Sequence, residues 1–324
     1  MDRILLAFVV VVGVPAATVL YVALVEWVLE RLPDRIRSSL RPWLWVGPAF
    51  LLLIIYLIYP TLNTIYLSFL DARSAGFVGL DNYIFAFTNN QMLIAFRNNF
   101  LWVVLVPFGV ILFGLIIALL SDRVSYEALV KGLIFLPMVI SFVAAGVIWR
   151  LMYDYAPPGR PQTGFVNAVL NAVIPGFEPQ VWTINQPINN FALMAVGIWM
   201  WTGFATVILS AGLKSIPEEI LEAARVDGAN EWRILWSITL PMISSTIAVV
   251  ATTMVINVLK VFDIVYVMTN GNFNTEVIAN RMYKEMFIFN HIGRASAIAV
   301  ILMLAIVPIM LVNIRRFQEQ ESVR

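Results

Sequence analysis

Long apolar stretches, separated by shorter polar segments, run through the whole chain. Each stretch is long enough to cross a hydrocarbon layer of about 30 Å as a helix. Backbone groups that face lipid must be hydrogen-bonded within their own segment, so these stretches are predicted to be α-helices. The sequence therefore predicts an all-α integral membrane protein with about seven transmembrane helices. The predicted spans are residues 4–28, 43–70, 98–120, 127–152, 190–213, 244–268 and 296–314.

Prolines lie inside several of these stretches. A proline removes one helical hydrogen bond and kinks the helix, and membrane helices tolerate such kinks. We therefore expect these spans to be kinked helices. The prolines concerned are Pro15, Pro48, Pro60, Pro107, Pro137 and Pro308.

The first apolar stretch can be interpreted either as a cleaved signal peptide or as a retained helix. A signal peptide has a basic start and an apolar core of about 7–15 residues. Here only Asp2 and Arg3 separate Met1 from the apolar run, and residues 4–28 are long enough to cross the bilayer. We therefore expect a retained transmembrane helix.

The composition supports the membrane assignment. Of the 324 residues 60% are apolar and only 13% are charged, and the mean hydropathy is +0.85, which is more apolar surface than a soluble domain can bury. The net charge of +1 provides no basic surface for nucleic acid. The chain has no cysteine, and His291 is its single histidine, so neither a disulfide nor a zinc site is predicted.

Basic residues are distributed unevenly between the connections. Lysine and arginine are enriched on the cytoplasmic side of membrane proteins. The connections after the first, third and fifth spans and the C-terminal tail carry most of them, so we expect these to be cytoplasmic, with the N-terminus outside and the C-terminus inside. The residues on this side are Arg31, Arg35, Arg37, Arg41, Arg123, Lys131, Lys214, Arg225, Arg233, Arg315, Arg316 and Arg324.

One sizeable polar connection is predicted on the cytoplasmic side, residues 213–241. Pro217 suits the first position of a helix, and Gly228 is a natural helix stop. A second helix is expected to begin near Asn230, a plausible N-cap, and Pro241 marks the start of the next span. Such a unit could dock on a partner protein, although an ordinary amphipathic loop is the plainer interpretation.

The residue spacing in this loop resembles the EAA loop of ABC-importer permeases. That pattern has Glu-Ala-Ala, a glycine four residues after the last alanine, and Ile-x-Leu-Pro after about nine more, and all its parts are present here. The resemblance implies contact with a cytoplasmic ATPase, with Glu222 as the main polar contact; a solvated helix charge remains the alternative for Glu222. The residues implied in coupling are Glu222, Ala223, Ala224, Asp227, Gly228, Leu240 and Pro241.

The resemblance extends over about residues 43–316. Residues 77–83, 262–271 and 293–297 resemble the F-x-G-L-x-N-Y, F-D-x-x-x-x-x-T-x-G and G-x-A-S-A segments of carbohydrate permeases of the maltose and alpha-glucoside type. The family's proline after the T-x-G segment is absent, which could alter the outer gate. The resemblance implies a six-helix type I permease core at 43–324, preceded by an extra N-terminal helix and its connection at 1–42.

This family assignment also implies partners and a location. A second permease, a dimer of cytoplasmic ATPase subunits and an extracytoplasmic sugar-binding protein are expected, in a bacterial plasma (inner) membrane. The chain contains no P-loop sequence, so ATP and magnesium are expected on the ATPase and no cofactor in this chain. No catalytic constellation is visible, and we expect a transporter subunit rather than an enzyme.

Polar and aromatic residues in the fifth and sixth spans are candidates for holding a solute. Ionisable groups within a span are costly and usually functional, and Lys260 and Asp263 are expected to share a helical face and to pair. A structural pair, and packing or interfacial roles for the tryptophans, remain open. Matching to the maltose-type permease implies the following sugar contacts: Gly197, Met200, Trp201, Phe204, Met254, Asn257, Val258, Lys260 and Val261.

A proton-coupled secondary carrier of a polar solute is the alternative function. It would require intramembrane carboxylates as a proton relay, and Asp263 is nearly alone in that role. Such carriers also contain paired repeats, and no clear repeat is visible here. The sequence does not identify the sugar: trehalose, maltose, sucrose, glucosylglycerol or another polyol all remain open.

Overall fold

The computed structural model describes residues 2–157 and 159–322, with side chains described for 11–13, 15–157 and 159–311. In these ranges the chain is helical and contains no β-sheet; Leu70 and Phe77 form an isolated bridge. The chain forms two compact units, Met1–Tyr66 and Leu67–Arg324. The expected all-α fold is therefore confirmed.

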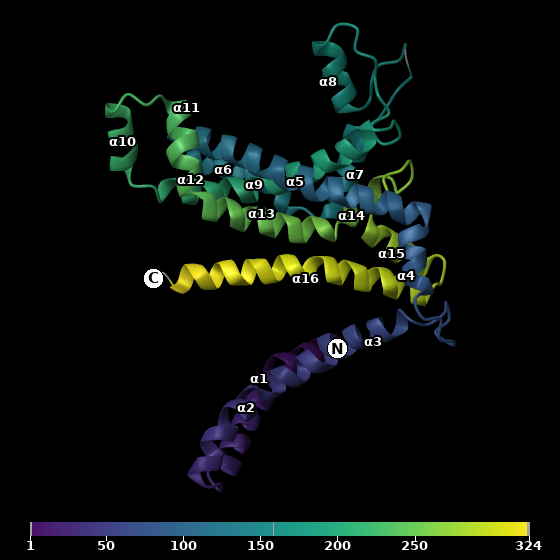
Figure 1. Cartoon of the computed structure of the whole chain (residues 1–324), viewed down its shortest axis with the longest axis vertical. Coiled ribbons are helices and arrows are strands. Elements are labelled where there is room, and N and C mark those ends of the chain that lie inside the picture. Colours follow the sequence, from purple (N-terminus) through teal and green to yellow (C-terminus); the bar gives the residue numbers. More distant parts are fainter. Residues whose placement is uncertain (1, 158, 323–324) are drawn as a thin grey trace. The chain divides into compact units, whose positions relative to one another are not determined.

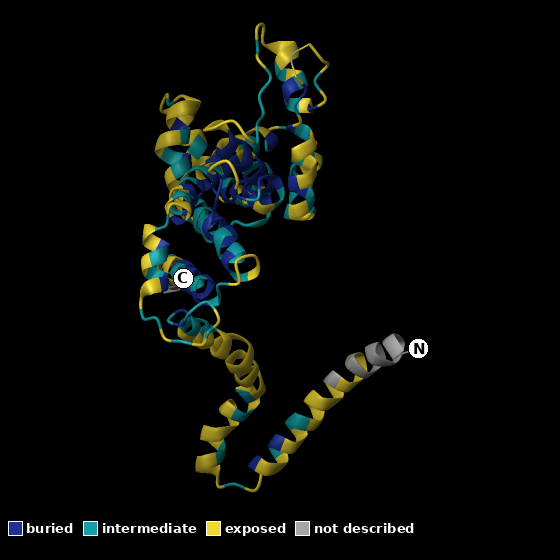
Figure 2. Cartoon of the chain, turned by 90° about the vertical axis from the view of Figure 1, so that its right-hand side faces the viewer, coloured by how far each residue is buried: buried dark blue, intermediate teal, exposed yellow. Residues whose placement is uncertain are grey.

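The first unit is a pair of helices joined by a short turn. Arg41 Nε lies 3.0 Å from Glu26 Oε1, and Trp45 Nε1 donates to the same oxygen at 2.8 Å, so a carboxylate on the first helix is held by two side chains of the second. The elements of this unit, the last of which extends one residue into the second unit, are α1 (Asp2–Leu29), α2 (Asp34–Leu53), the π-helical turn η1 (Ile54–Ile58) and α3 (Tyr59–Leu67). Their described apolar side chains are largely exposed, as lipid-facing helices require (Figure 2).

The second unit is built on three long helices, α5 (Asn90–Ser121), α9 (Ile188–Lys214) and α13 (Ser244–Leu259), which lie side by side (Figure 1). Shorter helices and the long α16 surround them. These are α4 (Asp81–Thr88), α6 (Glu127–Phe135), η2 (Leu136–Val139), α7 (Phe142–Met152), α8 (Phe165–Val173), α10 (Glu218–Val226), α11 (Glu231–Ile234), η3 (Leu235–Thr239), α12 (Leu240–Met242), α14 (Asp263–Met268), α15 (Ile278–Phe287) and α16 (Ile292–Ser322).

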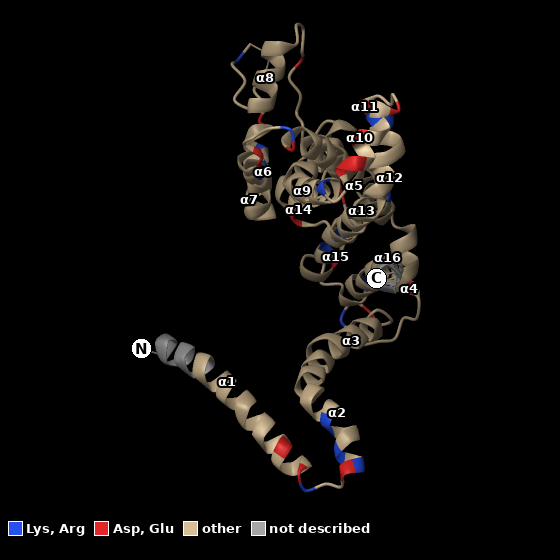
Figure 3. Cartoon of the chain, turned by 90° about the vertical axis from the view of Figure 1, so that its left-hand side faces the viewer, with Lys and Arg blue, Asp and Glu red and all other residues tan. Residues whose placement is uncertain are grey.

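Glycines allow the long helices to approach one another closely. A Cβ at Gly109 of α5 would lie 2.5 Å from Ile198 Cδ1, and one at Gly114 would lie 2.6 Å from Ala205 Cβ, so α9 occupies the space above both glycines. Small residues at such crossings are typical of membrane helix pairs, because lipid supplies no hydrophobic force between helices. Buried residues gather at this junction (Figure 2), and the long helices are almost free of charged residues (Figure 3).

In the described residues, five helices are long and apolar enough to cross a membrane, or up to seven spans if each of two bent helix pairs counts as one. The predicted span 127–152 is not one kinked helix, because η2 and α7 meet at a 100° bend. Pro137 lies in the 3₁₀ turn η2, Ile140 is extended, and the Ser141 hydroxyl caps α7 by accepting from Ala144 N. A proline followed by a capping serine therefore ends one helix and begins another.

The predicted span 244–268 is also interrupted. α13 ends at Leu259, Lys260 to Phe262 are not helical, and α14 begins at Asp263. At its other end α13 follows the segment Glu231–Met242 after a 68° bend. The predicted span 244–268 is thus two helices, α13 and α14, separated by the turn at 260–262. This turn and the bend before α13 both lie beside the candidate functional residues.

Candidate coupling surface and solute site

The polar connection between α9 and α13 folds into two short helices with a glycine between them. α10 follows Pro217, which is its N-cap residue rather than its first helical residue. Gly228 has a φ of +84°, a left-handed conformation that glycine adopts without strain. Asn230 Oδ1 accepts a hydrogen bond from Arg233 N at 2.8 Å, so Asn230 is the N-cap of α11 as predicted. Helix, glycine break and second helix are all confirmed.

Most of the residues predicted to contact an ATPase have exposed side chains. Glu222 lies on α10 with an exposed side chain, and among the described residues it has no hydrogen-bond or ion-pair partner. Ala223, Asp227 and Gly228 are also exposed, whereas Ala224 is half-buried. Further along, Leu240 is half-buried and Pro241 is exposed. The glutamate therefore remains available to a partner, and the coupling role of this set stays a prediction.

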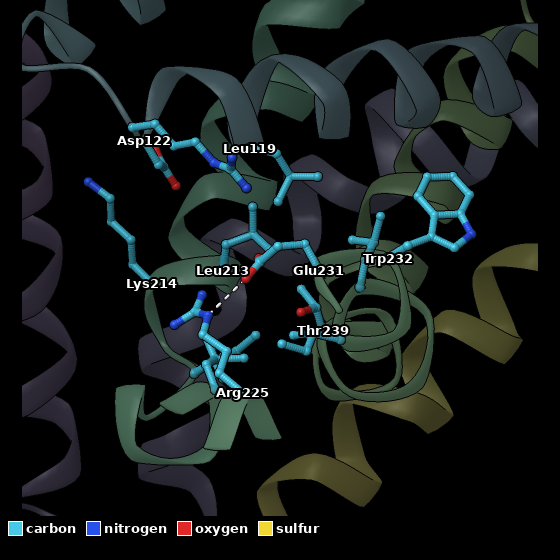
Figure 4. Close-up of a pocket in the computed structure, with 13 residues that line it drawn as sticks. Leu119, Asp122, Leu213, Lys214, Arg225, Glu231, Trp232 and Thr239 are labelled. Atoms are coloured by element: carbon cyan, nitrogen blue, oxygen red, sulfur yellow. Dashed lines mark hydrogen bonds and ion pairs between the residues drawn. The ribbon is translucent and has the colours of Figure 1, made fainter. Parts of the chain in front are cut away.

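An ion pair joins the two helices of the loop. Arg225 Nε of α10 donates to Glu231 Oε1 of α11 at 2.8 Å (Figure 4). This hydrogen bond to a carboxylate raises the pKa of the Arg225 guanidinium above its usual value. Both side chains are about half exposed, so the pair contributes little to stability and mainly orients α10 against α11.

A cavity of about 380 Å³ lies between this loop and the ends of α5 and α9 (Figure 4). Leu119 and Leu213 line it from the long helices, and Leu221 and Trp232 line it from the loop. On this side α10 is therefore not packed tightly against the bundle. The Arg225–Glu231 pair lies at the same cavity.

A charged network fixes the helix ends next to this cavity. Lys131 Nζ on α6 lies 2.7 Å from Asp122 Oδ1 and 2.5 Å from Glu127 Oε1. Lys214 Nζ, at the end of α9, lies 2.5 Å from the same Glu127 oxygen, and Ser210 Oγ donates to Asp122 at 2.8 Å. The network joins α5, α6 and α9, so the loop begins from a fixed platform.

A second cavity, of about 220 Å³, lies inside the bundle where α5, α7, α9 and the α13–α14 turn meet. Trp201 lies at its wall, with its ring centroid 6.0 Å from that of Phe142. Asn257 is hydrogen-bonded through Nδ2 to Thr253 O at 2.8 Å, which leaves its Oδ1 without a described partner. Aromatic rings suit the C–H faces of a sugar, and amide and charged groups suit its hydroxyls.

The cavity brings together most, but not all, of the residues predicted to contact sugar. Gly197, Trp201, Asn257, Val258, Lys260 and Val261 line it. Met200 and Met254 are buried core residues that do not line it. Phe204 packs on Trp201 at a centroid distance of 5.9 Å and lies behind the wall. The contact role of all nine stays a prediction.

The expected Lys260–Asp263 pairing is wrong. α13 ends one residue before Lys260, and Asp263 starts the next helix, so the two residues do not share a helical face. No ion pair joins them among the described side chains. Both instead line the cavity as separate charged groups. The physical cause is the non-helical turn at 260–262, which sequence periodicity did not reveal.

Trp102 is a cavity residue that the sequence interpretation missed. It lies on α5, is only 1% exposed, and its indole Nε1 is buried without a hydrogen-bond partner among the described residues. Its ring packs over Gly197, where a Cβ would lie 3.0 Å from Cζ3. The single tryptophan of the predicted span 98–120 was the available signal, because a buried indole N–H normally needs an acceptor.

A scan against family models matches residues 110–320 to "Binding-protein-dependent transport system inner membrane component". The match covers well over half of the chain. It includes residues 213–241, which we call the coupling loop, and most residues of the intramembrane cavity lined by Trp201 and Asn257, which we call the solute cavity. The chain therefore belongs to this family of binding-protein-dependent transport system inner membrane components.

Characterised relatives agree with this assignment. The osmoprotective compounds uptake permease protein GgtC of Synechocystis sp. is 59% identical over 281 residues, covering 87% of this chain and 100% of the relative. The alpha-glucoside transport system permease protein AglF of Rhizobium meliloti is 50% identical, covering 87% of this chain and 83% of the relative. Both relatives are permease subunits and not enzymes.

The fold is shared with a solved ABC transporter. A bacterial ABC transporter involved in the import of the acidic polysaccharide alginate matches with a TM-score of 0.72 and 24% identity, over 88% of this chain and 99% of that chain. At this identity the likeness establishes the fold alone. Family and fold together make the chain a multi-pass membrane permease subunit of an ABC importer, and they leave the proton-coupled carrier without support.

Proposed function

We propose that this subunit forms half of the import path for a neutral sugar or related polyol, which the intramembrane cavity binds. The observation that carries this proposal is the lining of that cavity. Trp102 and Trp201 line it together with Asn257, Lys260 and Asp263. Flat rings and hydrogen-bonding groups in one cavity match a solute with C–H faces and many hydroxyls. The relatives named for osmoprotective compounds and for alpha-glucosides support this class of solute.

The size of the cavity supports a second permease as a partner. Sites for small molecules measure roughly 300–1,000 Å³, whereas this cavity measures about 220 Å³. A disaccharide therefore needs a larger cavity than this chain forms by itself. A homologous permease opposite the cavity would complete its lining, and an extracytoplasmic binding protein would deliver the solute.

The exposed Glu222 surface supports docking of the loop on a cytoplasmic ATPase dimer. Binding and hydrolysis of ATP, with magnesium, would occur on those subunits. Their closure would move α10, and the cavity behind α10 leaves it room to move against the fixed ends of α5 and α9. The basic residues near this end of the bundle support a cytoplasmic loop and C-terminus and an external N-terminus, in a bacterial inner membrane.

Uptake by cavity variants tests the solute site. Cells lacking the native gene receive the chain or a variant, and uptake of radiolabelled trehalose and sucrose is measured. Trp201→Ala and Asn257→Ala should each reduce uptake about tenfold, because each removes a contact worth ~1.4 kcal/mol. Membrane abundance, measured by immunoblot, should stay unchanged.

Trp199→Ala is the matched control. Trp199 lies on the same helix, packs on Trp149 with centroids 5.5 Å apart, and does not line the cavity. Its replacement should leave uptake within about twofold of the wild type, which corresponds to a free-energy change of ~0.4 kcal/mol or less. Equal loss of uptake in Trp199→Ala and Trp201→Ala, with reduced abundance of both, would instead assign the tryptophans to packing.

A further inference from the structure

A third cavity, of about 390 Å³, lies at the end of the bundle opposite the coupling loop. Its wall is the segment Asn270–Asn274, between α14 and α15, together with the N-terminal turn of α5. Its size falls within the range of roughly 300–1,000 Å³ found for small-molecule sites. Most of its wall follows the T-x-G segment in the sequence, and it shares no lining residue with the intramembrane cavity.

The wall of this cavity has an unusual backbone that is held by amides. Asn270, Gly271, Phe273 and Asn274 all have positive φ values, between 51° and 70°. Asn98 Nδ2, on α5, donates to Asn274 O at 2.7 Å, and on α9 Asn189 Nδ2 donates to Phe273 O at 2.8 Å. The segment is thus held in a strained conformation by the two long helices. Such strain persists only where the surroundings enforce it, and it is concentrated at functional sites.

The charges beside the cavity neutralise one another. Glu276, which is 1% exposed, accepts from Lys284 Nζ at 2.7 Å and from Asn280 Nδ2 at 2.5 Å. Lys284 also donates to Asn270 O at 2.6 Å, and Arg281 is paired with the buried Glu285. With each cation matched by a carboxylate, the cavity has no excess charge to attract an ion. A neutral ligand suits it better.

Two exposed amide side chains on the cavity wall keep free hydrogen-bonding groups. Gln91 is exposed and its side chain has no hydrogen bond among the described residues. Asn274 Nδ2 donates to Gln186 Oε1 at 2.8 Å, which leaves Asn274 Oδ1 without a described partner. Amide groups of this kind can donate to and accept from hydroxyls. Half-exposed rings of Phe273 and Phe289 stand at the same cavity. Amide groups and rings together match a hydroxyl-rich molecule with C–H faces.

We infer that this cavity is a second binding site for a neutral polyhydroxylated solute, at the end of the bundle opposite the coupling loop. The site is in line with the intramembrane cavity, because Gln91 and Trp102 line the two cavities about 16 Å apart along α5, at a rise of about 1.5 Å per residue. A solute released at this end would be held here before it reaches the bundle interior. The inference goes beyond the proposed import path and does not depend on which partner delivers the solute.

Protection of an introduced cysteine from labelling tests this site, because the chain contains no cysteine of its own. Asn272→Cys places a thiol on the cavity wall at an exposed side chain that has no hydrogen bond of its own among the described residues. The full-length chain in nanodiscs is labelled with a membrane-impermeant maleimide, with and without trehalose. At ten times its dissociation constant a ligand leaves about a tenth of the sites free, so labelling should slow by about tenfold.

Asn171→Cys is the matched control, since Asn171 is an exposed asparagine on α8 outside every cavity described above. Trehalose should not slow its labelling, and glycine betaine, which has no hydroxyl, should protect neither thiol. Adding Phe289→Ala should weaken the protection of the Asn272→Cys variant. Adding Trp201→Ala and Asn257→Ala should leave it intact, which separates this site from the intramembrane cavity and from the proposed function.

Two outcomes would overturn the inference. Labelling of Asn272→Cys at an unchanged rate in saturating trehalose and sucrose would show that no hydroxylated solute binds there. Protection by the extracytoplasmic binding protein alone, and not by sugar alone, would assign the cavity to protein docking.

Discussion

At the scale of single residues, Glu222 is one of several exposed acidic side chains of the coupling loop without a hydrogen-bond or ion-pair partner among the described residues; Glu218, Glu219 and Asp227 are the others. Glu231 pairs with Arg225, and Glu127 pairs with Lys131 and Lys214, whereas Glu222 has no partner among the described residues. An exposed, unpaired carboxylate is available to another protein, but Glu218, Glu219 and Asp227 are available in the same way. The position of Glu222 in the EAA pattern is what distinguishes it, and its coupling role stays a prediction.

Charge reversal at this residue should uncouple the importer. In membranes that hold the assembled transporter, Glu222→Lys should lower solute-stimulated ATPase activity and uptake at least tenfold, or ~1.4 kcal/mol, because a like charge replaces the attraction at the interface. Basal abundance and insertion should not change, since the side chain is exposed.

Glu219→Lys provides the comparison. Glu219 is exposed in the first turn of the same helix, outside the residues that resemble the EAA pattern. Reversing the charge of Glu219 should destabilise α10 by only the few tenths of a kcal/mol expected from the helix dipole, and it should leave uptake and ATPase activity close to those of the wild type. Similar losses in the two variants would indicate a general charge effect, and full activity of Glu222→Lys would remove this glutamate from the coupling surface.

At the scale of elements, the crossing of α9 with α6 depends on one glycine. A Cβ at Gly203 would lie 2.6 Å from Phe135 Cα, which is backbone and cannot rotate away. The crossing places Trp201 and Phe204 of α9 next to the helix break that precedes α7. The same crossing therefore supports the wall of the solute cavity.

Gly203→Ala should destabilise the chain by about 1–3 kcal/mol, the range for overpacking. The thermal transition of the detergent-solubilised chain should fall accordingly. Gly132→Ala is the matched substitution on α6, where a new Cβ meets nothing within 4 Å. Because alanine favours helix over glycine by up to about 1 kcal/mol, Gly132→Ala should keep or raise the transition temperature. A transition unchanged by Gly203→Ala would contradict the close crossing.

At the scale of the whole molecule, the orientation in the membrane follows from charge. The coupling loop and its network of basic residues lie at one end of the second unit, and α4 and α15 lie at the other (Figure 1). A green fluorescent protein fused after Arg324 should fluoresce, because this reporter folds in the cytoplasm and the C-terminus is expected there. Alkaline phosphatase inserted at Asn171 should be active, because this reporter needs the outer side of the membrane and the loop containing Asn171 is expected there. The reverse pair of results would invert the assignment.

Along the sequence, the first compact unit ends at Tyr66, well beyond the boundary at residue 42 expected from the family pattern. The boundary at residue 42 separates the extra N-terminal helix and its connection from the predicted permease core, which is a different division from that into compact units. That boundary stays a prediction. The described part of the first unit buries few apolar side chains by itself, apart from Val25 and Leu29. Lipid or another subunit must cover the remainder.

The apolar helices and their approximate positions could be predicted from the sequence, because lipid forces each segment to satisfy its own backbone and so makes the pattern local. Among the described residues, the expected number of seven spans is reached if each bent helix pair counts as one. The coupling loop was predictable for the same reason: Gly228 and Asn230 act on their immediate neighbours. The breaks at Ser141 and at Lys260 were not predicted, because a capping residue inside an apolar run looks like part of a helix. Residues at both breaks line the solute cavity, so the breaks determine part of its lining.

The sequence by itself therefore determined that this is a helical permease with one polar helix–glycine–helix loop, since helix formation in lipid and loop geometry depend on residues close together in the chain. Only the tertiary structure decided which side chains share a cavity. Trp102, Phe142, Trp201 and Asp263 come from four different helices. Met200, next to Trp201, and Met254, about one turn before Asn257, are buried in the core instead. Side-chain direction across helix crossings depends on close packing between distant segments, and periodicity within one segment does not encode it.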